Sequence, residues 1–560
     1  MDYKNYIASK LNIDGVSAEE IASLIVTPPD TSLGDYALPC FRFAKIMRKA
    51  PNMIADDLAR NYVVDDNITK VVAVNGYLNF TVNRNNMVKN TISKILLEGE
   101  KYGSSNVGEG KTVCIDYSSI NIAKPFHIGH LSTTVIGGAL YRIYKFLGYN
   151  TIGINHLGDY GTQFGKLIYA YKAWGNKEEV EKGKIKELMR LYVKFHDEVE
   201  KDPSLDDKAR NYFKLIEQGD KECVELFTWF KDLTLTDVKK VYEDLDIVFD
   251  SYNGESFYND KMDVVINELN EKGLLKESDG AKIVDLESDG MPPCLILRSD
   301  GASLYATRDL AAAIYRKNTY DFYKCLYVVA YQQNLHFKQF FKVLDLMGKP
   351  WAKDMIHVAF GMVSLEEGTM STRKGKVVFL EDVINKCVEK AYDIINDKNP
   401  NLENKLDVAK AVGTGAVIFG ALSSSRIKDI VFSYDKVLNF DGETGPYVQY
   451  TYARCESVLK KAGAVGEYDY NNLLPIEYDL VALLTKFPQV VLTASEKYEP
   501  SMVTRYAVDV ASCFNKFYFD CKILGEEDNV KNFRLALTKA TKTVIKNALS
   551  LLGIKTPNKM

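Results

Sequence analysis

The stretch from Cys114 to Thr134 constrains the fold more than any other part of the sequence, because it joins a strand to a helix through a polar loop. The apolar, partly β-branched run from Thr112 to Tyr117 predicts a buried strand. Pro125 cannot continue a strand ladder, but it suits the start of a helix. Apolar residues at helical spacing then predict a helix from Ile128 to Leu147, which Gly148 would end. A helix that begins at the carboxyl end of a parallel strand binds anions, because its free N–H groups and its dipole both favour negative charge.

Two histidines in the first turn of this predicted helix are suited to bind phosphate. His127 and His130 are three residues apart and would share one face of the turn. Each ring could donate a hydrogen bond to a phosphate oxygen, and Gly129 would let a phosphate or a flat ring approach the backbone closely. The alternative is that one histidine caps the helix while the other packs against its neighbours. Two histidines that flank a glycine at a strand–helix junction favour the phosphate site.

The run His127-Ile128-Gly129-His130 resembles the HIGH motif of class I aminoacyl-tRNA synthetases. The preceding run from Ser118 to Phe126 is similar to the arginyl-tRNA synthetase version of that block, which has proline where this chain has Ile120. The resemblance implies that His127 and His130 are catalytic. It also implies that they bind ATP together with Gly129 and His336.

The run from Met370 to Gly375 is similar to a second motif of that family, the phosphate-binding loop usually written KMSKS. Thr372 stands where the family has its second lysine. The resemblance implies that Lys124, just before the HIGH-like motif, supplies the missing positive charge and is catalytic. Further ATP contacts are implied for Met370, Ser371, Arg373 and Lys374. The alternative for this loop is an ordinary basic surface turn.

Selection of arginine requires carboxylates, because a guanidinium is planar, permanently charged and bound by carboxylates in a two-pronged geometry. Asp309 follows Tyr305 by four residues, so both would share one face of a helix start. The resemblance assigns these two residues to the guanidinium, with Glu255 as a further ligand. It places five residues near the α-amino and carboxylate groups of arginine: Asp116, Ser119, Asn121, His130 and Gln333. The alternatives are a helix cap for Asp309 and a surface turn for Glu255.

Length and composition indicate several globular domains. The chain has 560 residues and no apolar run that approaches the roughly 20 residues of a membrane helix. Its N-terminus lacks the basic-then-apolar pattern of a signal peptide. The nine cysteines form no C-x-x-C pair, which argues against a zinc site and a disulfide framework. We therefore expect a cytoplasmic protein with no protein-held metal and no membrane partner.

The order of the predicted elements indicates the α/β class. Alternating strands and helices after residue 111 predict a parallel sheet with a ligand crevice at its carboxyl edge. We expect a Rossmann-like catalytic domain at 111–400 with an insertion at about 176–299. A small α/β domain at 1–105 resembles the family's tRNA-contacting module, and an all-α bundle at 401–560 resembles its anticodon-binding domain.

Several individual elements are also predicted. Asn75-Gly76 and Asp279-Gly280 indicate tight hairpins. A helix is expected from Thr162 to Trp174, a strand from Met355 to Val363, and one continuous helix from Tyr478 to Ser495.

The end of the chain is basic. No acidic residue follows Asp528, whereas seven basic residues do: Lys531, Arg534, Lys539, Lys542, Lys546, Lys555 and Lys559. This asymmetry indicates a polyanionic partner, although a solvated helix face would show the same pattern. The resemblance implies tRNA contacts by Tyr447, Gln449, Arg454, Lys539, Lys542 and Met560.

The resemblance implies an arginine–tRNA ligase. It would activate L-arginine with ATP to arginyl-adenylate and pyrophosphate, and then transfer arginine to the 3′-terminal adenosine of its tRNA. Attack of a carboxylate on the α-phosphate needs positioning and charge stabilisation, and Mg²⁺ would be held mainly by the ATP phosphates. A pocket that reads polar groups discriminates well, so we expect no editing of mischarged tRNA. We expect a monomer, because no long heptad pattern occurs.

Three other functions stay open. Another HIGH-type nucleotidyltransferase would share His127 and His130 but would need no large helical tail. A non-catalytic RNA-binding relative would carry a degraded HIGH motif, which is intact here. A class I synthetase for a different amino acid is disfavoured by Tyr305, by Asp309 and by the block before His127.

Overall fold

The computed structural model describes residues 3–28, 30–122, 124–298, 305–365, 378–468 and 472–560. The chain divides into two compact units. The first comprises Met1–Tyr102, Ser457–Phe487 and Ser512–Val544, and the second comprises Gly103–Glu456, Pro488–Ala511 and Ile545–Met560.

The first unit contains a three-stranded antiparallel sheet with the order β1-β3-β2. Its strands are β1 (Tyr36–Pro39), β2 (Ile68–Val74) and β3 (Tyr77–Val82). Asn75 and Gly76 join β2 to β3 with φ angles of 50° and 80°, so the predicted hairpin is confirmed. The helices of this N-terminal part are α1 (Tyr3–Ser9), α2 (Ala18–Leu24), α3 (Ala44–Met47), α4 (Pro51–Asn61) and α5 (Arg84–Glu98).

The later segments of the first unit are helical. Within α18 (Pro475–Leu484), Glu477 forms a buried ion pair with Arg534, whose Nε lies 2.7 Å from the Glu477 Oε1. The prediction of one continuous helix from Tyr478 to Ser495 is wrong, because α18 ends at Leu484 and a separate helix, α19 (Phe487–Glu496), follows and lies almost wholly in the second unit. Pro488 lies in the first turn of α19, where its missing N–H is tolerated.

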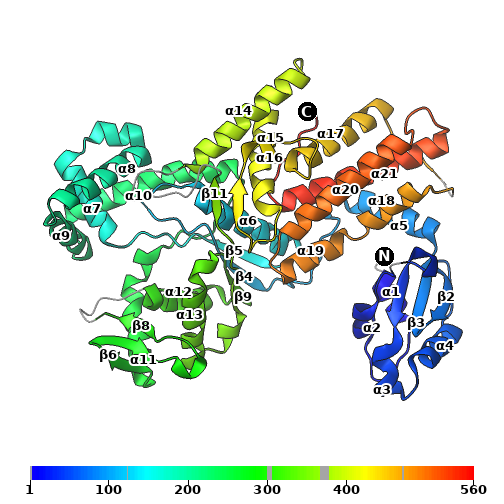
Figure 1. Ribbon diagram of the computed structural model, residues 1–560, viewed down its shortest axis with the longest axis horizontal. Coiled ribbons are helices and arrows are strands. Elements are labelled where there is room, and N and C mark those ends of the chain that lie inside the picture. The colour runs from blue at the N-terminus through cyan, green and yellow to red at the C-terminus, as the bar shows by residue number, and fades with distance from the viewer. Residues whose placement is uncertain (1–2, 29, 123, 299–304, 366–377, 469–471) are drawn as a thin grey trace. The chain divides into compact units, whose positions relative to one another are not determined.

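A four-stranded parallel sheet forms the centre of the second unit, with the order β10-β9-β4-β5. Its strands are β4 (Thr112–Asp116), β5 (Asn150–Ile154), β9 (Lys324–Tyr327) and β10 (Met355–His357). Asp116 points to α12 (Tyr305–Tyr320), whereas the next residue, Tyr117, lies against Gly137 of α6 (Leu131–Phe146). Because side chains alternate across a strand, these two helices cover opposite faces of the sheet (Figure 1). The predicted α/β class with a Rossmann-like parallel sheet is confirmed.

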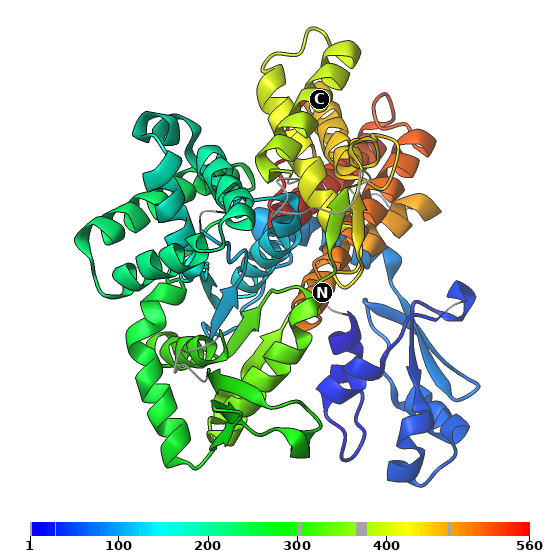
Figure 2. The same ribbon diagram turned by 60° about the vertical axis from the view of Figure 1, so that its left-hand side comes forward.

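The chain between β5 and β9 contains helices and a further sheet, in the region where an insertion was predicted. The helix α7 (Thr162–Trp174) has the predicted bounds and packs with α8 (Lys177–Lys201), α9 (Leu205–Glu217) and α10 (Lys221–Asp244), which form the cyan-to-green helical group in Figure 2. After α11 (Met262–Glu271), an antiparallel sheet follows, made of β6 (Leu275–Ser278), β7 (Ala281–Val284) and β8 (Cys294–Leu297). Asp279 and Gly280 form the turn between β6 and β7, as predicted.

The predicted strand from Met355 to Val363 is too long. β10 ends at His357, and Val363 begins a separate strand, β11 (Val363–Leu365), which pairs in parallel with β12 (Ile430–Phe432). β12 lies in the region that was predicted to be wholly helical, and its three residues are too few to show an alternating pattern.

The remaining helices are α13 (Asn334–Leu346), α14 (Leu380–Lys398), α15 (Lys405–Leu422), α16 (Tyr434–Val437), α17 (Gly445–Ala462), α20 (Ser501–Asp520) and α21 (Asp528–Leu551). Within the described ranges, none of the helices has the length and apolar character that a bilayer crossing needs.

Candidate active site

The loop that follows β4 has a strained backbone. Ser118 and Ser119 are consecutive non-glycine residues with positive φ angles of 67° and 39°. Such conformations cost roughly 1–3 kcal/mol each and persist only where the surroundings impose them. Here the N–H of Ser118 donates to Thr133 Oγ1 at 3.0 Å, and its hydroxyl lies 2.7 Å from the Tyr242 hydroxyl. The contacts with α6 and α10 therefore fix the direction in which the loop leaves the sheet.

The two histidines of the HIGH-like motif cap the turn that leads into α6. The Nδ1 atom of His127 accepts a hydrogen bond from the N–H of Gly129 at 3.0 Å, and the Nδ1 atom of His130 accepts one from the N–H of His127 at 3.2 Å. Because Nδ1 of His127 is an acceptor, its neutral ring carries the proton on Nε2 and can donate it to a ligand. His127 can therefore cap the helix start through Nδ1 and donate to a phosphate through Nε2–H, so the two predicted alternatives are compatible.

Burial lowers the pKa of both histidines. The pKa of His127 falls from 6.5 to about 4 because its ring is desolvated. The pKa of His130 falls to about 3, mainly through burial and further through the neighbouring His127 and Lys124. Both rings are therefore neutral hydrogen-bond donors at physiological pH.

These lowered pKa values predict a loss of stability in mild acid. An unfolded chain binds protons at these histidines below pH 6.5, whereas the folded chain resists them until about pH 4 or below. Stability contributed by the neutral rings is therefore complete above pH 6.5 and decreases as the pH falls below it. We expect the Tm of the wild type to fall more steeply between pH 6.5 and 4 than that of a His127→Asn/His130→Asn variant, measured by circular dichroism. Parallel Tm profiles for the two proteins would contradict this prediction.

The described residues that flank the KMSKS-like run on both sides, β11 and Val378–Leu380, lie beside the histidine turn. β11 contacts the turn at Ile128–His130, and after the loop the N–H of Ile128 donates to Val378 O at 3.1 Å. The N–H of Leu380 donates to Phe126 O at 2.9 Å. The predicted ATP contacts in between lie outside the described residues, namely Met370, Ser371, Arg373 and Lys374.

Asp309 is held by His336, at a distance of 2.6 Å between Oδ2 and Nε2. Burial alone would raise the pKa of Asp309 and lower that of His336, but the hydrogen bond outweighs burial and shifts both in the opposite directions. Asp309 lies in the second turn of α12, so it does not cap that helix. His336 was predicted to contact ATP, and in this structure it contacts the carboxylate predicted to bind arginine.

The side chain of Glu255 is only 15% exposed, so this residue does not form the surface turn that was its alternative. Its Oε2 lies 3.9 Å from Nη1 of Arg308, whose guanidinium lies 4.3 Å from the centre of the Tyr160 ring. Burial raises the pKa of Glu255 to about 7; Arg308 opposes that shift, whereas the charges of Asp309 and Asp159 add to it. Glu255 and Asp309 are thus close enough to repel each other, which favours a cation between them.

The other predicted arginine contacts differ in exposure. Asp116 is buried and forms contacts with Ser119 and Arg316. Asn121 is exposed, and its backbone forms a bridge with Gly158. Gln333 is exposed at the start of α13, and Tyr305 is 69% exposed at the start of α12.

The predicted tRNA contacts include one residue that is misplaced. Gln449 is fully buried, and its amide donates to the backbone oxygens of Ala411 at 3.0 Å and Lys555 at 2.7 Å. A direct contact of Gln449 with RNA is therefore wrong, because its side chain holds the interior of the second unit together. The other five predicted tRNA-contacting residues are half-buried or exposed: Tyr447, Arg454, Lys539, Lys542 and Met560.

Some basic residues near the end of the chain form ion pairs within the protein, which leaves them less available to bind a polyanion. Lys531 pairs with Asp528 at 2.5 Å, and Arg534 is buried against Glu477. At least two of the seven basic residues therefore already have an acidic partner within the first unit.

Three residues near the site were not predicted from the sequence: Arg308, Arg316 and Asp159. Asp159 is buried and accepts hydrogen bonds from the backbone N–H and the hydroxyl of Ser256, at 2.9 and 2.8 Å. Its position in the Gly158-Asp159-Tyr160-Gly161 turn after β5 was a usable signal, because that edge of a parallel sheet presents ligand groups. The two arginines lie within a helix and give no such signal.

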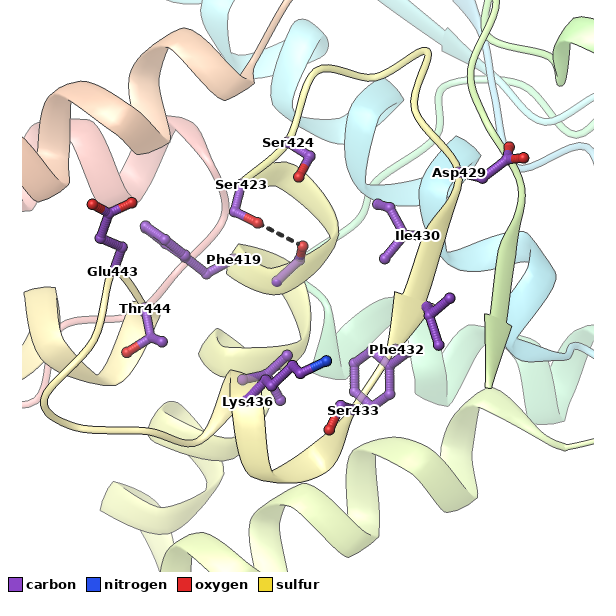
Figure 3. Close-up of a pocket in the computed structure, with 14 residues that line it drawn as sticks. Phe419, Ser423, Ser424, Asp429, Ile430, Phe432, Ser433, Lys436, Glu443 and Thr444 are labelled. Carbon is purple, nitrogen blue, oxygen red and sulfur yellow. Dashed lines mark hydrogen bonds between the residues drawn. The ribbon is translucent and has the colours of Figure 1, made fainter. Parts of the chain in front are cut away.

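A cavity of about 330 Å³ lies elsewhere in the second unit (Figure 3). It is lined by the end of α15, by β12 and α16, and by the turn before α17, with Ser423, Lys436 and Thr444 among its polar residues. Among the predicted site residues that the structure describes, none lines this cavity.

Comparison with known proteins identifies the family. Residues 91–434 match the catalytic domain of class I tRNA synthetases (R), residues 448–560 match the DALR anticodon-binding domain, and residues 1–82 match the arginyl-tRNA synthetase N-terminal domain. The arginine–tRNA ligase of Alkaliphilus metalliredigens is 55% identical, over all of both chains. The chain belongs to the arginyl-tRNA synthetase family. The arginine–tRNA ligase of Clostridioides difficile is 56% identical, again over all of both chains.

A solved arginyl-tRNA synthetase from Thermus thermophilus has the same fold as this chain. The TM-score is 0.85, with 24% sequence identity, and the match covers 100% of this chain and 99% of that one. The resemblance inferred from the HIGH-like block is therefore confirmed at the level of the arginyl-tRNA synthetase family.

Proposed function

We propose that the chain is an arginine–tRNA ligase, which forms arginyl-adenylate from L-arginine and ATP and passes arginine to its tRNA. The observation that carries this proposal is the full-length identity of 55% with a protein named arginine–tRNA ligase. The chemistry of the site agrees with it, because an intact pair of neutral histidines caps a helix start and two interacting carboxylates occur at Glu255 and Asp309.

The proposed arginine pocket uses both carboxylates. The guanidinium binds between Asp309 and Glu255, because its planar fork of donors matches carboxylate oxygens. The α-amino and carboxylate groups lie toward Ser119, Asn121 and Gln333. Tyr305 closes the guanidinium end from the start of α12.

The proposed ATP site lies at the histidine turn. The Nε2–H groups of His127 and His130 donate to phosphate oxygens, and Gly129 allows close approach of the nucleotide. These neutral donors stabilise the charge that builds up on the α-phosphate as the arginine carboxylate attacks it and pyrophosphate leaves. Mg²⁺ enters as part of the ATP substrate. Within the described ranges no three histidine, cysteine or acidic side chains gather to form a metal site.

We assign the proposed tRNA contacts to both units. Lys539 and Lys542 belong to the first unit, whereas Tyr447, Arg454 and Met560 belong to the second. Arg454 lies 5.0 Å from the centre of the Tyr450 ring, which forms a charged and aromatic pair of the type that binds RNA bases.

The proposal is tested by arginine-dependent exchange between ATP and pyrophosphate, with and without a matching arginine tRNA. We expect exchange with arginine in the presence of tRNA, followed by formation of arginyl-tRNA. Arginyl enzymes usually require bound tRNA for activation, so exchange without tRNA should be much weaker. A protein that shows no arginine-dependent exchange in either condition would overturn the proposal.

Lys124→Ala should slow arginine activation on the order of 10²-fold, because removal of one preorganised charge-stabilising group typically has this effect on kcat. Lys124 lies three residues before His127 in the sequence, and its charge lowers the pKa of His130. The measurement is the exchange rate at saturating arginine, ATP and tRNA. Lys145→Ala removes an exposed lysine from the other end of α6 and should leave the rate unchanged. Equal exchange rates in the Lys124 and Lys145 variants would contradict the catalytic role of Lys124.

A further inference from the structure

A buried guanidinium lies beneath the carboxyl ends of three adjacent strands. Arg316, in α12, is 1% exposed, and its Nη2 lies 2.7 Å from Oδ2 of Asp116 at the end of β4. The same nitrogen lies 3.3 Å from Nδ1 of His156, just after β5, and the guanidinium lies 5.4 Å from the ring centre of Tyr327, at the end of β9. Removing such a charge from water is costly, and a buried ion pair is by itself weak evidence of a stabilising role.

The ion pair continues into the strained loop after β4. The other carboxylate oxygen of Asp116, Oδ1, accepts a hydrogen bond from the Ser119 hydroxyl at 2.5 Å. Ser119 has a φ angle of 39°, so its backbone needs an external constraint to hold it. Arg316, Asp116 and Ser119 therefore form a continuous chain of polar contacts from α12 to this loop.

The same helix carries the proposed guanidinium ligand. Asp309 precedes Arg316 by seven residues, so the two side chains share one face of α12 two turns apart. One turn of α12 thus presents a carboxylate to the far end of arginine. Another turn fixes the loop that is proposed to contact its α-amino end.

We propose that Arg316 is a positioning residue that sets the length of the arginine pocket, acting through Asp116 and Ser119. This inference rests on the proposed function, because it assigns Asp309 and Ser119 to opposite ends of the substrate. Asp116 contacts Arg316 through one carboxylate oxygen and Ser119 through the other, and so positions Ser119. A pocket of fixed length admits arginine but excludes homoarginine, which is longer by one methylene group.

The main variant is Arg316→Met, which keeps the volume but removes the charge. We expect kcat/KM for arginine to fall on the order of 10²-fold, because misplaced contact groups can have an effect of this size. The preference for arginine over homoarginine should fall by roughly tenfold, since discrimination by one methylene is worth about 10- to 200-fold at most. KM for ATP should stay close to its wild-type value, because the histidine turn keeps its own caps. A general loss of packing would not produce this selective change.

Further variants test the route from Arg316 to the loop. Ser119→Ala should weaken selection against homoarginine without disturbing the ion pair. Arg316→Lys retains a charge for Asp116 and should restore part of the selectivity. In Asp116→Asn/Arg316→Met both buried charges are removed, and the defect should be no larger than that of Arg316→Met alone, because both residues act along one path.

The matched control is Arg534→Met, which breaks a similarly buried arginine–carboxylate pair in the first unit. It should lower Tm but leave the preference for arginine over homoarginine unchanged, measured with saturating tRNA. All variants are first compared by thermal unfolding. If Arg316→Met does not fold, the preference for arginine over homoarginine is measured in Arg316→Lys and in the double variant instead, and that preference tests the positioning role.

The outcomes separate the two proposals. No arginine-dependent exchange in the wild type would overturn the proposed function itself. Exchange in the wild type with an unchanged arginine-to-homoarginine ratio in the folded Arg316 variants would overturn the positioning role alone. A reduced ratio in these variants, with the ratio of the Arg534 control intact, supports it.

Discussion

Asp309→Asn will raise the KM for arginine by roughly 10²- to 10³-fold, because loss of one partner of a desolvated charge pair costs about 2–5 kcal/mol. The amide keeps the shape of the side chain but cannot offer two anionic oxygens to a guanidinium. Asp309 is also the carboxylate whose charge helps to raise the pKa of the neighbouring Glu255. Its loss therefore lowers the pKa of Glu255 but leaves that residue as the remaining anionic ligand.

The measurement is the arginine dependence of pyrophosphate exchange at saturating ATP and tRNA, with the KM for ATP determined in parallel. Asp321→Asn is the matched control, because Asp321 directly follows α12 and its side chain is 89% exposed beside Lys317. Asp321 has a φ angle of 42°, which asparagine tolerates as well as aspartate does. A KM for arginine that is equal in both variants would rule out Asp309 as a guanidinium ligand.

His127→Asn should lower kcat for arginine activation by roughly 10²- to 10³-fold, the usual effect of losing one donor to a developing oxyanion. Asparagine is a good N-cap residue, so its side-chain oxygen can replace Nδ1 in capping the N–H of Gly129. The variant therefore removes the Nε2–H donor while it keeps the helix start. Activity should be lost without a comparable loss of stability.

Single-turnover formation of the adenylate, together with Tm, separates these two roles of His127. His196→Asn makes the same replacement in α8, outside the proposed site, and should leave adenylate formation unchanged. If His127→Asn formed adenylate at the wild-type rate, the histidine would serve only as a cap.

The fold around β4 and α6 was predictable because several local signals agree. The strand is apolar, Pro125 and Gly148 mark the boundaries, and the helical spacing is regular. The hairpin at Asn75-Gly76 was predictable for a similar reason, since two residues with positive φ are needed there. The short strands β11 and β12 could not be predicted, because their stability comes from a partner almost seventy residues away in the chain (Val363 with Ile430).

The site was only partly predictable. The spacing of His127 and His130 at a predicted helix start indicated a phosphate site, whereas the roles of Asp309 and Glu255 were implied by the family resemblance. The sequence could not indicate what neutralises these carboxylates in the free protein, since Arg308 and His336 reach Glu255 and Asp309 only through tertiary packing. Gln449 was wrongly predicted to contact tRNA, because its position in a matching motif does not show that the side chain is buried.

In the arginine pocket proposed above, the guanidinium would take the place of Arg308 beside Glu255 and of His336 beside Asp309. The incoming guanidinium must displace partners that the protein itself supplies, so the measured affinity is a difference between two sets of contacts. A lysine ammonium is a compact point charge and cannot replace a planar fork on two carboxylates at once. One carboxylate would then keep its internal partner or be left without a cation. Competition from within the protein thus adds to the selection of arginine, independently of how well lysine fits the pocket.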